Sequence, residues 1–261
     1  MSAMTTDLDL RYRNTGNRTL LGLVDIPPGR ALDCGCGAGD NARLLRAAGW
    51  RVTGVTRDAA ELVAAAAECE RVELADLAEG LRFAADESYD LVVLSHILEH
   101  LVEPAGLLAE AQRVLAPGGR IAVALPNIAH YRERAKHLLG RFDYTETGVM
   151  DGTHLRFFTV RTARELLKQH GLRILAAGGG GGLPWWRSRQ WLARPLVERA
   201  DRWALSTHPN LFAWQSVFLT APARGATTVV PTARAAEPAA GEPAAGATSP
   251  APGGSAAAAG A

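Results

Sequence analysis

The sequence predicts an α/β protein built on a doubly wound, mostly parallel sheet, and two observations carry this prediction. First, short apolar runs alternate with helical segments from Pro28 onward, as in Leu91–Leu94 and Ile121–Leu125. Second, these runs are apolar at every position, which is typical of parallel strands covered on both faces. Right-handed crossovers between such strands place helices on both sides of one sheet.

The expected elements follow one another with short connections. Continuous apolar or β-branched residues predict strands over Arg30–Cys34, Val52–Val55, Arg71–Leu74, Tyr89–Leu94, Arg120–Leu125, Leu172–Ala176 and near Trp214–Thr220. Apolar residues at helical spacing predict helices over Asp40–Ala48, Ala59–Glu68, Pro104–Leu115, Ile128–Leu139 and Val160–His170. The segment 140–158 is a polar, aromatic-bearing insertion, and the glycine run 178–182 is predicted to be a hinge or loop.

Composition divides the chain into three parts. An N-terminal helical segment or cap is expected over residues 1–27, followed by one globular domain over residues 28–220. Residues 221–261 are mostly Ala, Pro and Gly and include no aromatic side chain. Such a segment buries too little apolar surface to offset the entropy of ordering it, so we expect a disordered tail.

Charge and cysteine content narrow the range of partners. The 28 Lys and Arg against 27 Asp and Glu give a formal net charge of +1, so no basic face for nucleic acid is expected. Three cysteines fit a reducing compartment, and the first residues are acidic where a signal peptide is apolar, so we expect a cytoplasmic location. The longest apolar runs are strand-length, which predicts no membrane span. A homodimer is left open.

A glycine-rich loop follows the first expected strand and opens the first expected helix. It runs from Asp33 to Gly39 as DCGCGAG. Closely spaced glycines let the backbone approach a ligand beside the free N–H groups of a helix start. Position 40 is Asp rather than the third glycine of a dinucleotide fingerprint. The Asp33 carboxylate favours a ligand that carries an ammonium group and would repel a pyrophosphate.

As a set, these motifs resemble the class I S-adenosylmethionine-dependent methyltransferases. The matching segments are ALDCGCGAGD (31–40), VTGV (52–55), ADL (75–77), YDLVVLSHILEHL (89–101) and LAPGGRIAVALPN (115–127). The resemblance implies a Rossmann-like, seven-stranded sheet with a lid insertion, S-adenosyl-L-methionine as the cofactor and methyl transfer to a small-molecule acceptor. Segments 127–159 and 208–219 further resemble a bacterial branch associated with polysaccharide and specialised-metabolite biosynthesis.

The resemblance also implies which residues contact the cofactor, all of them in loops that follow strands. They are Asp33, Gly35, Cys36, Gly37, Gly39, Thr56, Asp58, Asp76, Leu77, Ser95 and His96. Thr56 departs from the family, which usually ends its second strand with a carboxylate that accepts from both ribose hydroxyls. Asp58 is a candidate to reach back to the ribose. The alternative for Thr56 is that it only caps the following helix.

The insertion supplies the expected acceptor site. Methyl transfer from a sulfonium is an in-line displacement that depends mainly on alignment, and a hydroxyl acceptor also benefits from a general base. Because histidine titrates near neutrality, His154 is the leading candidate catalytic residue and His96 the second, with structural hydrogen bonding in the lid as the alternative for His154. Tyr144 and Arg156 are expected to contact the substrate, although Arg156 can instead pair with Asp151.

Three other patterns are open to more than one interpretation. The stretch HILEH (96–100) matches H-x-x-E-H, which on a helix would place His96 and His100 on one face for zinc. Because it directly follows an apolar strand, we instead expect Glu99 and His100 to orient the loop, and no metal. Cys34 and Cys36 lack a second cysteine pair and are expected to pack. Tryptophans and arginines alternate over 185–203, which favours a cap or an oligomer contact over a nucleic-acid surface.

The expected function is therefore O-methylation of a sugar or specialised metabolite. Two alternatives remain. The altered second strand is compatible with a non-catalytic cofactor-binding partner of a biosynthetic enzyme. A nucleotide-dependent oxidoreductase shares the architecture, and Arg57 suits a 2′-phosphate, but Asp40 argues against it.

Overall fold

The strands lie where the alternation of apolar runs predicts them. A computed structural model describes residues 15–184 and 193–223, all within the first of the two units into which the chain divides, Met1–Val230 and Pro231–Ala261. Seven strands form one sheet in the order β3-β2-β1-β4-β5-β7-β6. Their bounds are β1 Arg30–Cys34, β2 Arg51–Thr56, β3 Arg71–Leu74, β4 Tyr89–Ser95, β5 Leu115–Pro126, β6 Leu172–Gly181 and β7 Ala213–Pro222.

The directions of the strands determine which loops lie together at the edge of the sheet. Strands β3, β2, β1, β4 and β5 are mutually parallel, and β7 pairs antiparallel with both β5 and β6. The chain goes outward from β1 through β2 and β3, then returns to β4 on the other side of β1. Strand order therefore reverses between β1 and β4, and loops after their carboxyl ends border one crevice. The predicted doubly wound, mostly parallel seven-stranded sheet is confirmed.

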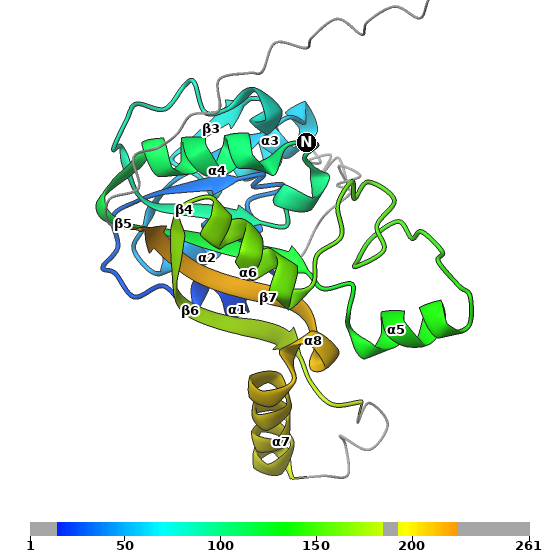
Figure 1. Cartoon of the computed structure of the whole chain (residues 1–261). Coiled ribbons are helices and arrows are strands. Elements are labelled where there is room, and N and C mark those ends of the chain that lie inside the picture. Colours follow the sequence, from blue (N-terminus) through cyan, green and yellow to red (C-terminus); the bar gives the residue numbers. More distant parts are fainter. Residues whose placement is uncertain (1–14, 185–192, 224–261) are drawn as a thin grey trace, which may run out of the picture. The chain divides into compact units, whose positions relative to one another are not determined.

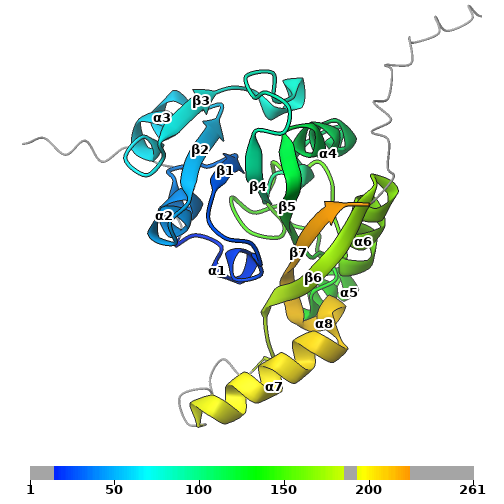
Figure 2. The ribbon, with the colours of Figure 1, turned by 90° about the vertical axis from the view of Figure 1, so that its left-hand side faces the viewer.

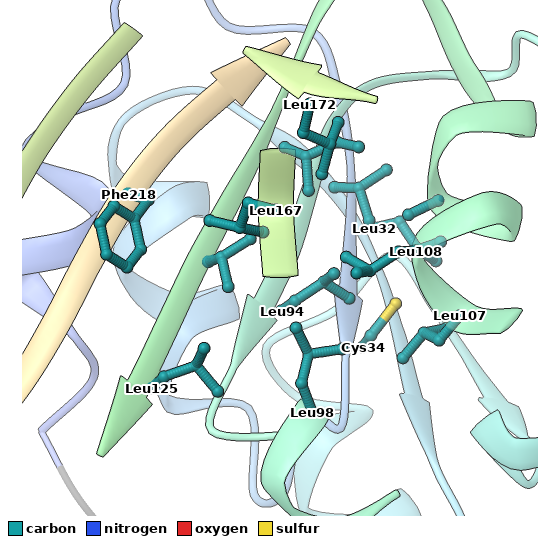
Figure 3. Close-up of a cluster of buried hydrophobic side chains, with 14 of the residues drawn as sticks. Leu32, Cys34, Leu94, Leu98, Leu107, Leu108, Leu125, Leu167, Leu172 and Phe218 are labelled. Atoms are coloured by element: carbon teal, nitrogen blue, oxygen red, sulfur yellow. The ribbon is translucent and has the colours of Figure 1, made fainter. Parts of the chain in front are cut away.

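Helices cover both faces of the sheet (Figure 2). Their bounds are α1 Arg18–Leu21, α2 Asp40–Ala47, α3 Ala59–Ala65, α4 Pro104–Arg113, α5 Tyr131–Leu138, α6 Val160–Gln169, α7 Arg194–Thr207 and α8 Pro209–Phe212, with short 3-10 turns η1 Leu77–Glu79 and η2 Leu98–His100. Leucines from α4 and α6 pack on one face with strand residues such as Leu32 and Leu94 (Figure 3). Residues of α1 and α2 pack on the other face against Ala31 and Val93.

The helix predicted from Ile128 begins later in the structure. A helix was expected from Ile128, but α5 begins only at Tyr131, because Asn127 starts a turn in which its side chain accepts from the N–H of Ala129 (3.0 Å). Figure 1 shows α5 and the long connection to α6, both in green, outside the two helical layers. None of the helices in the described ranges is long and apolar enough to cross a membrane.

The glycine run is part of the sheet, so its prediction as a hinge or loop was wrong. Strand β6 continues through Gly181, and Gly178 to Gly180 pair with residues of β7. A Cβ at Gly179 would lie 2.7 Å from the Cβ of Ala213, and one at Gly180 would lie 2.8 Å from Nε2 of Gln215. Glycine is needed here because the two strands approach too closely for side chains.

Gly181→Ala is expected to destabilise the protein by about 1–3 kcal/mol. Gly181 has φ of +150°, and its Cβ would lie 3.0 Å from Cα of Ala213 and closer still to the carbonyl oxygen of Phe212. The measurement is urea unfolding, with Gly106→Ala in α4 as the control, because nothing lies within 4 Å of a Cβ there. Equal unfolding midpoints for Gly181→Ala and the wild type would contradict the close approach.

The ends of the domain extend slightly beyond their predicted limits. Strand β7 ends at Pro222, two residues past the expected boundary at 220, and Leu20 of α1 is fully buried against the sheet. Residues 1–14, most of the expected tail (224–261) and Trp185, Trp186 and Trp191 lie outside the described residues. Trp203 of α7 is described and exposed.

Candidate active site

The glycine loop connects β1 to α2 at the point where the strand order reverses. Gly35, Gly37 and Gly39 have φ of +72°, +52° and +87°, which side chains rarely adopt. A Cβ at Gly35 would collide with Cδ1 of Ile97, the residue that follows His96 after β4. The loop therefore brings its backbone against the loop that leaves β4.

Asp33 is a buried carboxylate with no hydrogen-bond partner among the described residues. Its side chain is 0% exposed, and neither carboxylate oxygen is satisfied. The pKa of Asp33 is raised to about 7, mainly by burial. The nearby Asn41 side chain lowers the pKa, and the negative charge of Asp40 adds a smaller rise. A buried, unpaired carboxylate is costly to a fold unless another group neutralises it.

Cys36 packs beneath the loop. A Cβ at Gly54 of β2 would lie 2.7 Å from Sγ of Cys36 and 2.9 Å from Sγ of Cys69, so the two thiols share the space that this glycine leaves. A hydrogen bond with Cys69, together with burial, raises the pKa of the Cys36 thiol. The Cys36 thiol is therefore protonated at neutral pH, in keeping with packing.

At the end of β2, Thr56 faces a carboxylate from α3. Its hydroxyl donates to Oε2 of Glu61 (2.7 Å) and accepts from the N–H of Asp58 (3.1 Å). The cap of α3 is Asp58, whose Oδ1 accepts from Ala60 N–H (2.7 Å), so the alternative of Thr56 as the helix cap is wrong. A carboxylate therefore lies beside the carboxyl end of β2 although the strand itself ends in threonine.

Two further predicted residues follow β3. Asp76 caps η1 by accepting from the N–H of Ala78 (2.9 Å). Leu77 begins η1 and packs against the buried cluster on the α4 face of the sheet. Leu77 also lies close to Gly35, since Cδ1 of Leu77 would be 4.0 Å from a Cβ there. The loops after β1 and β3 therefore meet.

His96 follows β4 in the left-handed conformation with φ of +58°, which is uncommon for residues other than glycine. Its Nδ1 lies 3.2 Å from Oε1 of Glu99, and its Nε2 lies 2.9 Å from Oε1 of Gln215. Burial lowers the pKa of His96, but the hydrogen bond and charge of Glu99 outweigh it and leave the pKa raised. With an acceptor at each nitrogen, His96 is a donor on both sides.

A chain of side-chain hydrogen bonds joins His96 to the glycine-loop helix. Gln215 of β7 exchanges two hydrogen bonds with the amide of Asn17, at 2.9 and 3.3 Å. Asn17 also donates to the hydroxyl of Ser95 (3.3 Å), and its backbone N–H donates to Asn41 in α2 (2.8 Å). The backbone N–H of Leu20 donates to Oδ1 of Asn17 (3.1 Å), which fixes the orientation of the Asn17 amide and, through the exchange, which atom of Gln215 faces His96.

His154 of the insertion lies beside Glu99 and His100. Its Nε2 is 4.0 Å from Oε1 of Glu99, and its ring meets that of His100 edge-on, with centroids 4.8 Å apart. Burial lowers the pKa of His154, so the ring is neutral at pH 7. Backbone N–H groups of Leu155 and Arg156 donate to the carbonyl of Glu99 at 2.9 and 3.1 Å, which fastens the insertion to η2.

The H-x-x-E-H stretch is not a helix that presents His96 and His100 side by side. The left-handed backbone at His96 ends β4, and only Leu98–His100 form a short 3-10 turn. His154, from the insertion, is the ring that contacts His100 instead.

The other two predicted substrate contacts lie at the outer side of the insertion. Tyr144 is 59% exposed, and its ring packs near those of Phe142 and Phe157. The Arg156 guanidinium donates to the carbonyl oxygens of Leu101 (3.3 Å) and Val102 (3.1 Å).

With this geometry established, comparison with known proteins identifies the family. A family model described as a methyltransferase domain matches residues 7–177, well over half of the chain. The chain belongs to this methyltransferase family. The family and the fold imply S-adenosylmethionine as the cofactor.

Individual relatives resemble this chain in sequence and in fold. This chain is 32% identical over 157 residues to a probable S-adenosylmethionine-dependent methyltransferase of Mycolicibacterium smegmatis. The match covers 58% of this chain and 60% of that protein. The chain is 28% identical over 180 residues to a ubiquinone biosynthesis O-methyltransferase of Rhodopseudomonas palustris, covering 68% and 65%. The matches span less than two thirds of either relative. The crystal structure of an Archaeoglobus fulgidus SAM-dependent methyltransferase shares the fold, with TM-score 0.54, 18% identity and coverage of 74% and 86%.

The residues after β1 fit the cofactor that the family implies. S-adenosylmethionine carries an ammonium group, and Asp33 is a buried carboxylate without a partner. The cofactor also needs backbone within reach, and three left-handed glycines supply it after β1. Both features lie at the carboxyl end of β1, beside the switch point.

Three residues of this site were missed or undervalued by the sequence analysis. Glu61 was hidden because nothing in the sequence shows that the first turn of α3 points at Thr56. Asn17 belongs to a segment without a motif, and Gln215 lies in a mostly apolar strand that also carries Ser216 and Thr220. The glutamine at position 215, 4% exposed in the structure, is the signal that points to a function, because glutamine is rarely buried.

Proposed function

We propose that this chain transfers a methyl group from S-adenosylmethionine to an oxygen atom of a small molecule, within the bacterial branch that serves polysaccharide or specialised-metabolite biosynthesis. The observation that carries the proposal is the buried, unpaired Asp33 beside the glycine loop. A relative named as an O-methyltransferase supports oxygen as the acceptor atom.

The proposed cofactor site draws on the loops after β1 to β4. Asp33 accepts from the ammonium group, and the backbone of Gly35, Gly37 and Gly39 approaches the methionine part. Glu61, held by Thr56, accepts from the ribose hydroxyls in place of the missing strand-end carboxylate. The segments that would contact the adenine and the methyl end are Asp76–Leu77 and Ser95–His96.

The proposed reaction is an in-line displacement. The bond from sulfur to the methyl carbon breaks as the bond from the acceptor oxygen to that carbon forms, and S-adenosylhomocysteine leaves. His154 takes the proton of the acceptor hydroxyl on Nε2, because its Nδ1–H donates to the carbonyl of Val149 (3.1 Å). His96 orients the methyl end rather than acting as a base, since both its nitrogens face acceptors. Tyr144 and Arg156 form the outer rim of the acceptor site.

The test is formation of S-adenosylhomocysteine with a panel of hydroxyl-bearing acceptors, namely nucleotide sugars, glycosides and polyketide lactones. Methylated oxygen in the product, located by mass spectrometry, supports the proposal. A protein that binds S-adenosylmethionine but forms no S-adenosylhomocysteine with any acceptor would support the alternative, a non-catalytic partner.

Glu61→Gln is expected to weaken S-adenosylmethionine binding by about tenfold, because a carboxylate acceptor is replaced by a weaker amide acceptor. Calorimetric titration measures the change. Glu70→Gln is the matched control, since that carboxylate pairs with Arg51 at the surface. If Glu61→Gln and Glu70→Gln bind the cofactor equally, Glu61 is not a ribose ligand. Thr56→Asp is then the informative second variant, because it restores the strand-end carboxylate.

A further inference from the structure

Three side chains from two segments that are distant in sequence lie close together where the insertion meets η2. Glu99 and His100 belong to η2, and His154 comes from the loop before α6. One ligand atom from each lies within 4.8 Å of the other two. Glu99 is 0% exposed and His154 is 8% exposed, so the group is sheltered from solvent on most sides.

The hydrogen bonds fix both imidazoles in the form that binds metal. Nδ1 of His154 donates to the carbonyl of Val149, which leaves the lone pair on Nε2. The hydroxyl of Thr153 donates to Asp151 (2.6 Å) and so accepts from Nδ1 of His100 (3.2 Å), which leaves a lone pair on Nε2 of His100 as well. Metal-bound histidines in proteins are usually oriented by such a bond from the other nitrogen.

Glu99 adds a carboxylate oxygen that the described residues do not satisfy. Its Oε1 accepts from His96, but Oε2 is buried without a hydrogen-bond partner. A buried carboxylate oxygen without a hydrogen-bond partner is costly to the fold unless a cation or a donor reaches it.

We infer that Glu99, His100 and His154 form a binding site for a divalent transition-metal ion, with Zn²⁺ as the natural fit to two imidazoles and one carboxylate. Ligand distances of about 2.0–2.2 Å require the three side chains to close by about an ångström on the ion. Three protein ligands leave at least one coordination position open, as in catalytic metal sites. No metal was expected from the sequence, because HILEH directly follows an apolar strand; in the structure the second imidazole comes from His154 of the insertion and not from His96.

The inferred metal site adds to the proposed function. Metal binding itself does not depend on methyl transfer, but the role of the ion in activating the acceptor rests on the proposed function. A hydroxyl of the acceptor that binds the open position becomes more acidic, so it can attack the methyl group after its proton has passed to solvent. In the metal-loaded protein, Nε2 of His154 holds the ion rather than the proton. The inferred acceptor is then a molecule whose reacting hydroxyl has a second oxygen nearby to chelate the ion.

Metal binding is tested without cofactor or acceptor, so that it stands apart from methyl transfer. Metal-free protein is titrated with Zn²⁺ by calorimetry and with Co²⁺ by visible absorption. We expect one equivalent to bind, with a Co²⁺ spectrum of low coordination number. His100→Ala and His154→Ala are expected to weaken binding by about tenfold or more.

The control is His170→Ala, a histidine at the end of α6 away from the cluster, which should leave Zn²⁺ affinity within about twofold. Glu99→Gln checks the carboxylate, and thermal unfolding shows whether Zn²⁺ stabilises the wild type but not the variants. If the three cluster variants bind Zn²⁺ as tightly as the control His170→Ala does, the site is overturned, even if methyl transfer is demonstrated. Zn²⁺ binding lost in the three cluster variants would support it, even if no methyl acceptor is known.

Discussion

Asp33→Asn is expected to weaken S-adenosylmethionine binding by about 10–100-fold while making the cofactor-free protein more stable above pH 7. The loss of affinity follows from replacing a carboxylate, which can pair with the ammonium group, by a neutral amide. The gain in stability follows from burial, because Asp33 is fully buried without a partner until the cofactor supplies one. Few other substitutions would change ligand affinity and stability in opposite directions.

The pH dependence of stability follows from the pKa of Asp33, which burial raises from 3.8 to about 7. Between these values the folded protein retains a proton that the unfolded chain has lost, so stability falls as pH rises from about 4 to 7. Above pH 7 the carboxylate is charged in both states and the full destabilisation remains. Asp33→Asn should therefore unfold at a higher temperature than the wild type at pH 8 and at a similar temperature at pH 4.

Cofactor affinity should show the opposite trend in the same range. Below pH 7 the free protein holds Asp33 protonated, and binding the ammonium group must release that proton. Affinity should therefore drop by about tenfold per pH unit below 7 in the wild type and stay level in Asp33→Asn. Calorimetry in buffers of different ionisation enthalpy measures the proton released. Asp86→Asn, a surface carboxylate paired with Arg113, is the control; a wild-type affinity independent of pH would contradict the role of Asp33.

The sheet was predictable because each apolar run is buried on both faces. Val92, Val93 and Leu94 alternate between the two buried clusters, so each of these positions of β4 needs an apolar side chain. The result is a continuous apolar run that can be recognised in the sequence. The glycine run at 178–182 was not predictable, because a glycine signals either a free turn or a strand approached closely by its neighbour. Only the position of β7 decides between the two.

The geometry of the glycine loop after β1 was predictable, and the contacts around η2 were only partly so, for a physical reason. Asp33 and the glycines are contiguous, so spacing alone describes their geometry. His154 and Glu99 are 55 residues apart, and their contact depends on how the insertion folds back onto η2. Glu61 reaches Thr56 because of the rotation of α3, which is set by packing rather than by any local pattern.

His154→Ala is expected to lower the turnover number by about 10²–10⁴-fold without changing S-adenosylmethionine affinity. Its Nε2 carries the lone pair that is proposed to take the proton of the acceptor, and the partners of His154 among the described residues lie in η2 and the insertion rather than in the glycine loop. His137→Ala, in α5 just before the insertion, is the control for general disturbance of this part of the chain. Turnover near that of the wild type would reject His154 as a participant.

Chelation separates the two tasks that His154 can perform. If the imidazole acts as a base, protein stripped of metal retains its turnover, and only His154→Ala is slow. If it holds an ion, stripping the metal slows the wild type to the level of His154→Ala, and Zn²⁺ restores the wild type alone. His100→Ala gives the same answer independently, because Nδ1 of His100 faces Thr153 and its Nε2 is useful only as a ligand. A defect in His100→Ala that matches the effect of chelation therefore indicates metal-assisted transfer, whereas normal turnover in that variant leaves His154 as the base.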